Sequence, residues 1–81
     1  MKAGVIRKLA EAHSQAVLDA AADALAEGET ISLEVQGEDD GERLTHLMLA
    51  SRIRARVDGG TDLKSAFREV MAEVRGVIAN G

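Results

Sequence analysis

The stretch from Asp39 to Val57 has apolar residues at helical spacing on more than one flank. One flank holds Leu44, Leu47, Met48 and Ala55, and another holds Leu49, Ile53 and Val57. A helix on the surface of a domain shows one apolar stripe, so apolar character this wide predicts neighbouring elements on at least two sides. We therefore expect residues 39–57 to form a central helix around which the rest of the chain packs.

The composition predicts one small globular domain spanning residues 1–81. Apolar residues make up 46% of the chain and charged residues 30%, which is typical of a folded protein. Fourteen residues are alanine, and Phe67 is the single aromatic residue. Small side chains bury little area, so we expect a thin core, and self-association would add to its stability.

Three further segments have a helical pattern. Residues 2–12 form one apolar face, and residues 15–27 form a rotated one that ends at Gly28. The two segments are one long helix or two, and we favour a break at Ser14, because serine is a good N-cap. The last helix follows a cap at Thr61 or Asp62, and its stripe is Leu63, Ala66, Phe67, Val70, Met71, Val74, Val77 and Ile78.

Residues 29–36 alternate apolar and polar side chains, which is typical of a strand. No second strand pattern occurs in the sequence, so two outcomes are open. The segment is an extended connector with Ile31, Leu33 and Val35 plugged into the helices, or it pairs with the same segment of a second copy. After it, Asp39 and Glu42 have the spacing of a capping box. The predicted fold class is all-α, a three- or four-helix bundle with one extended segment at about 29–36.

Charge and cysteine content narrow the function classes. The net charge of −4 argues against a freestanding nucleic-acid binder. No cysteine is present, which removes disulfides and thiolate metal sites and suits a reducing compartment. Charged residues interrupt every apolar run, so we expect no signal peptide and no membrane span. These observations predict a cytoplasmic protein.

The sequence contains no recognisable catalytic, cofactor or metal motif. The acidic run around Gly37–Glu42 lacks the alternation of a calcium loop, and capping with solvation explains it. His13 and His46 have no partner at ligand spacing. The serines have no adjacent base, and no phosphate-binding glycine loop is present. We therefore expect a non-enzymatic protein that needs no cofactor.

Candidate contact residues come from two places. Ile31, Leu33 and Val35 could form an apolar edge. Arg52, Arg56 and Arg68 belong to a basic set with Arg54, Lys64 and Arg75. The simpler interpretation of that set is a solvated face paired with Glu69, Glu73 and the acidic stretch.

Two resemblances follow from these patterns. The order extended segment, helix, glycine turn and helix from Ile31 to Ile78 resembles the ribbon-helix-helix fold of small DNA-binding repressors. That resemblance implies a dimer pairing through residues 30–36 that reads DNA, although Glu34 would face phosphates. The run GEDDGERLTH at residues 37–46, with MKAGVIRKLAEAHS at residues 1–14, resembles short bacterial proteins of unknown function and implies no activity.

The function that we predict is a small interaction domain that binds a protein partner or itself, possible partner contacts being the six residues Ile31, Leu33, Val35, Arg52, Arg56 and Arg68. The alternative is the DNA-binding dimer.

Overall fold

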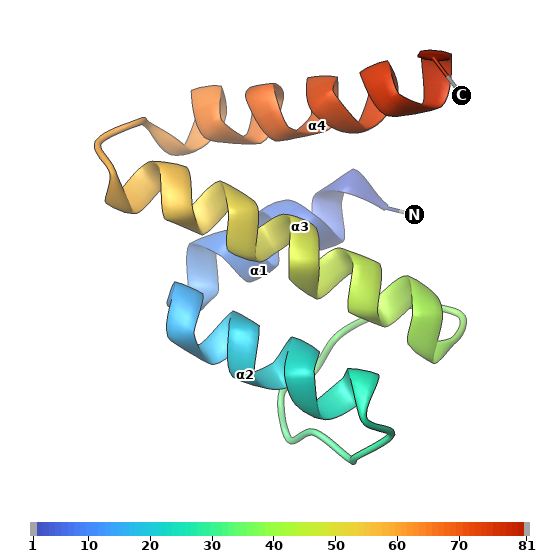
Figure 1. Ribbon diagram of the computed structural model, residues 1–81. Helices are drawn as coiled ribbons and strands as arrows, with labels where there is room; N and C mark the ends of the chain where they lie inside the picture. The colour runs from blue at the N-terminus through green and yellow to red at the C-terminus, as the bar shows by residue number, and fades with distance from the viewer. Residues whose placement is uncertain (1, 81) are drawn as a thin grey trace.

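The computed structural model describes residues 2–80, with side chains described for residues 2–75. Residues 2–80 contain four helices and no strand, which confirms the all-α prediction. The helices are α1 (Ala3–Ala12), α2 (Gln15–Ala26), α3 (Asp40–Asp58) and α4 (Leu63–Asn80). Figure 1 shows α3 crossing the middle of the molecule, with α1 behind it and with α2 and α4 on either side.

α3 is the central helix, as its wide apolar character predicts. It contacts α1, α2 and α4, and Leu47, Ala50 and Ile53 on it are fully buried. One part of the prediction is wrong: Met48 is 56% exposed, and Ala55 is also exposed. Three neighbouring helices cover three sides of α3, so a fourth side remains open to solvent.

Local capping interactions set the helix ends. The predicted break after α1 is confirmed, because the Ser14 hydroxyl accepts a hydrogen bond from the Val17 N–H at 3.2 Å. Gly28 follows α2 with φ of +81°, a left-handed conformation that favours glycine. Asp62, rather than Thr61, caps α4: its Oδ2 accepts from the Ser65 N–H at 3.0 Å.

The start of α3 departs slightly from a capping box. Asp39 Oδ1 accepts from the Glu42 N–H at 2.8 Å, as predicted. The Glu42 carboxylate, however, accepts from the N–H of Glu38 at 2.9 Å rather than from that of Asp39. The reciprocal bond therefore forms one residue earlier than the motif predicts, and it still satisfies a backbone donor ahead of the helix.

Residues 29–39 connect α2 to α3 without helix or strand and bend at residues 32–33 and 38–39, so this segment is not the strand that its alternation predicts. Val35 is 7% exposed, and Ile31 and Leu33 are half-buried against the same core. The backbone carbonyl of Val35 accepts a hydrogen bond from Arg43 Nε at 3.1 Å. In the single chain, this segment therefore matches the first outcome: it connects two helices, and its apolar side chains pack against them.

α4 lies on α3 through Ala66 and Val70, which are fully buried. Leu63, Phe67, Met71 and Val74 lie on the same stripe and are half-buried. Val77 and Ile78 of the predicted stripe lie outside the residues whose side chains are described. Within residues 2–80, no helix combines the length and the apolar character that crossing a membrane requires.

Candidate functional site

His46 is the most buried polar residue of the core, and both of its ring nitrogens bond to backbone. Nε2 lies 3.1 Å from the backbone nitrogen of Lys2, and Nδ1 lies 2.8 Å from the carbonyl oxygen of Gln36. An N–H can only donate and a carbonyl can only accept, so the ring carries its proton on Nδ1. His46 therefore joins three segments and leaves neither nitrogen for a ligand.

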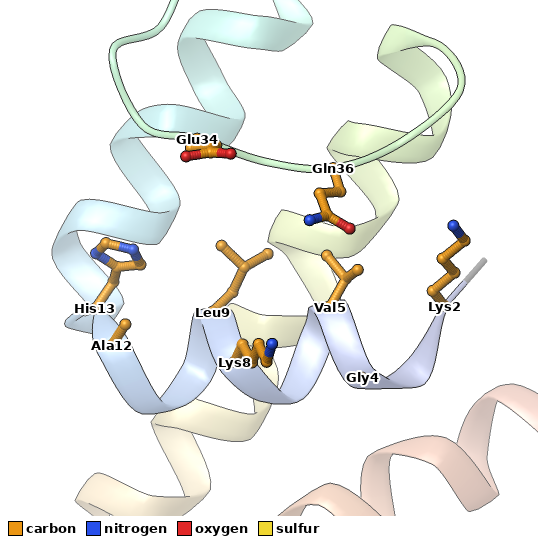
Figure 2. Close-up of a pocket in the computed structure, with 9 residues that line it drawn as sticks. All are labelled: Lys2, Gly4, Val5, Lys8, Leu9, Ala12, His13, Glu34 and Gln36. Carbon is orange, nitrogen blue, oxygen red and sulfur yellow. The ribbon is translucent and has the colours of Figure 1, made fainter.

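The described part of the chain contains no cluster of side chains that could bind a metal ion. No group of three His, Asp or Glu side chains there could hold an ion. His13 ends α1, where its backbone N–H donates to the Leu9 carbonyl at 3.1 Å. The imidazole of His13 lies at one end of a groove, as Figure 2 shows, and Lys2 lies at the other.

That first groove, the α1–connector groove, has a volume of about 510 Å³. Val5 and Leu9 of α1 point toward the connector, which contributes Glu34 and Gln36 on the opposite side (Figure 2). Lys8 also lines it. Its charges are mixed, because Lys2 and Lys8 line it together with Glu34.

A second hollow, here called the α2–α3 face, lies between Ala22, Asp23 and Asp19 of α2 and Leu44, Met48 and Arg52 of α3. Asp19 is held in place because it accepts a hydrogen bond from the Ser51 hydroxyl. The side chains of Asp23 and Arg52 make no hydrogen bond or ion pair with any residue that the structure describes. Met48, the most exposed large apolar residue on this face, lies in the same hollow.

A third hollow, here called the α1–α4 groove, has a volume of about 450 Å³. Phe67 and Met71 of α4 supply its apolar surface. The other described residues that line it are all cationic: Arg7, Lys64, Arg68 and Arg75. None of these four side chains is hydrogen-bonded or ion-paired among the described residues.

The predicted basic set does not form one surface. Arg56 bridges α3 and α4, with NH1 3.4 Å from Glu69 Oε1 and NH2 paired with Glu73. Arg52 lies on the α2–α3 face, and Arg68 lies in the α1–α4 groove. The interpretation as a paired face therefore holds for Arg56 and not for Arg52 or Arg68.

The predicted apolar edge points inward. Val35 is buried within the chain, and Ile31 and Leu33 are half-buried against the same core. Packing of the helices instead exposes Met48, Asp23 and Arg7. None of these three residues is among the candidate contacts predicted from the sequence. A signal existed for Met48, because Thr45 and Arg52, three and four residues away on the same stripe of α3, are polar.

Comparison with curated proteins found no match, and comparison with solved structures found none either. The model of one family matches residues 1–79, in keeping with the predicted resemblance to short proteins of unknown function. The chain therefore belongs to the family described as "Family of unknown function (DUF6952)".

Proposed function

We propose that this chain is a small, non-enzymatic interaction domain that forms a symmetric homodimer through the α2–α3 face. The observation that carries the proposal is the position of Met48. This side chain is 56% exposed, and it lines the same hollow as an unpaired acid on α2, Asp23, and an unpaired base on α3, Arg52.

The apolar part of the face supplies the driving force. Met48 and the half-buried Leu44 border the small side chains Ala22 and Ala26 of α2. Small residues let a second helix approach closely, and a flexible methionine packs well against an uneven surface. A standard interface buries about 800 Å² per partner, which is about a sixth of this chain's 5065 Å² of accessible surface.

The charges on the face suit a second copy. In a two-fold dimer the same patch meets itself, and opposite charges favour the register in which Asp23 of one copy faces Arg52 of the other. The symmetry then forms the reverse contact as well. Two ion pairs would then border a central Met48–Met48 contact. Such complementarity contributes mainly to orientation and specificity, while the apolar centre contributes affinity.

A charge-exchange experiment tests this arrangement. Arg52→Asp alone places two acids opposite each other in the dimer, and Asp23→Arg alone places two bases opposite each other. We expect sedimentation equilibrium to show a dimer for the wild type and a monomer for each variant. An equal mixture of the two variants should restore dimers, because each facing pair is again of opposite charge.

Arg75→Asp is the matched control, since it makes the same change outside the face and should leave the dimer intact. Circular dichroism confirms that each variant is folded. A wild-type protein that stays monomeric up to about 1 mM, or a mixture that stays monomeric, would overturn the proposal.

The DNA-binding alternative makes a different prediction. Within residues 30–36, the side chains of Ile31, Leu33 and Val35 pack against the core of their own chain. This packing favours self-association through helices over an intermolecular ribbon. We expect no mobility shift of mixed-sequence duplex DNA at low salt. A shift that weakens steeply with added salt would support the DNA-binding alternative.

A further inference from the structure

The α1–α4 groove gathers positive charge in a chain whose net charge is −4. Arg7 comes from α1, and Lys64, Arg68 and Arg75 come from α4 at spacings of four and seven residues. Like charges brought together repel one another, and none of the described residues that line this groove carries a carboxylate. An anionic occupant would relieve that repulsion.

The acidic side chains near the groove either form ion pairs with Arg56 or do not line the groove. Glu69 and Glu73 of α4 pair with Arg56 of α3. Glu11, one turn beyond Arg7 on α1, does not line the groove and forms no ion pair with Arg7. The sequence of residues 76–81 contains no acidic side chain. The side chains of the described chain therefore leave the positive field of the groove unneutralised.

The apolar surface of the groove is Phe67 and Met71, which lie one turn apart on α4 and are half-buried. The cations extend further along the same helix, from Lys64 to Arg75. At 1.5 Å per residue, this separation of eleven residues spans about 16 Å, or three helical turns. α1 and α4 both pack on α3 from different sides (Figure 1), and the groove lies between them.

Cations spread over three turns of α4, with Phe67 and Met71 among them, fit an elongated partner better than a compact anion. An amphipathic helix presents an apolar stripe at the same period, and acidic residues beside that stripe would face the arginines. Three of the four cations are arginines, whose planar guanidinium matches a carboxylate with two parallel hydrogen bonds.

We propose that the α1–α4 groove binds an acidic amphipathic helix of a partner protein. The inference is independent of the homodimer, because the α1–α4 groove and the α2–α3 face share no lining residue. The partner helix lays its apolar side chains on Phe67 and Met71. Its carboxylates pair with Arg7 and Arg68.

Adjacent residues of α1 provide a matched test. Arg7 lines the α1–α4 groove, whereas Lys8 lines the α1–connector groove (Figure 2), and both are exposed. Arg7→Glu and Lys8→Glu therefore make the same change of charge on the same helix. The probe is a fluorescent peptide of about 15 residues, with leucine at helical spacing and glutamate at the flanking positions. Fluorescence anisotropy at about 50 mM NaCl reports binding.

We expect the Kd of the peptide to rise by about tenfold or more for Arg7→Glu and to stay within about twofold for Lys8→Glu. Arg68→Glu, on the other wall, should repeat the loss if Arg7→Glu fails to fold. Repeating the titration in the Arg52→Asp background separates this result from the homodimer, since that variant leaves the groove unchanged.

Four outcomes would overturn the inference. The first is no binding of the peptide at about 0.5 mM protein. The second is equal binding of a scrambled peptide of the same composition, which would show attraction by charge alone. The third is an equal loss for Lys8→Glu. The fourth is tighter binding of inorganic triphosphate or duplex DNA than of the helical peptide.

Discussion

Replacing His46 by leucine tests whether one buried imidazole holds three segments together. Leucine fills a similar space but has no hydrogen-bonding group. The change therefore removes the bond from the Lys2 N–H at 3.1 Å and the bond to the Gln36 carbonyl at 2.8 Å. It leaves the apolar packing around Leu47 and Ile53 largely in place.

The magnitude follows from the two lost bonds. A hydrogen bond inside a protein contributes about 1 kcal/mol net, so His46→Leu should lower the free energy of unfolding by about 2 kcal/mol. Both backbone partners belong to residues with exposed surface, Lys2 and Gln36, so water can partly replace the imidazole. The loss should therefore stay below the full cost of two buried unsatisfied groups. In a domain of this size it corresponds to a fall in Tm of about 8–16 °C.

Urea denaturation followed by circular dichroism at the helical band measures this loss. His46→Asn and His46→Gln serve as partial replacements. The asparagine amide can donate from near the position of Nδ1 toward Gln36, and the glutamine oxygen can accept near the position of Nε2 from Lys2. Each should recover about half of the loss, or about 1 kcal/mol.

Two results would refute the reasoning about His46. A leucine variant at least as stable as the wild type would show that the backbone bonds contribute nothing net. Replacements no better than leucine would show that the assigned tautomer or the geometry of the two bonds is wrong.

The other predictions concern single positions. Gly28→Ala forces a side chain into a φ of +81° and should lower the free energy of unfolding by roughly 1–2 kcal/mol. Gly4→Ala adds a methyl group in open space within α1 and should raise it by about 0.5 kcal/mol. Urea denaturation compares the two variants, and a change of stability in the same direction for both would contradict the argument. Ile53→Ala, at a fully buried site of α3, should cost about 2–5 kcal/mol, and a loss below about 1 kcal/mol would mean that α3 is not central. Hydrogen bonds from the backbone and then the side chain of Ser65 hold the pKa of Asp62 below its ordinary 3.8. The Asp62 cap therefore contributes fully above pH 3.8 and is lost as the pH falls through the lower folded value. Asp62→Asn should lose less stability than wild type between about pH 7 and about pH 3, and identical losses would argue against the cap.

Short-range signals made much of the fold predictable. The four helices, the break at Ser14, the turn at Gly28 and the caps at Asp39 and Asp62 all depend on residues within three or four positions of one another. A cap satisfies orphan backbone groups whatever the rest of the chain does, so it can be identified before any tertiary contact is known.

The candidate sites were much less predictable, because each depends on how helices are rotated against one another. Arg52 and Arg56 are one turn apart on α3, yet α4 pairs only Arg56 through Glu69 and Glu73. Arg7 and Lys8 are neighbours in sequence and line different grooves. Periodicity identifies an apolar face and leaves open which of its edges a neighbouring helix covers.

The sequence by itself determined which segments are helical, with a favoured break at Ser14, and that the helix at residues 40–58 needs several neighbours. Only the tertiary structure decided that Val35 plugs the core, that Met48 stays exposed, and that His46 joins Lys2 to Gln36. The physical reason is separation along the chain. Lys2 and His46 are 44 residues apart, and bonds over such distances form only after packing has fixed the position of every element between them.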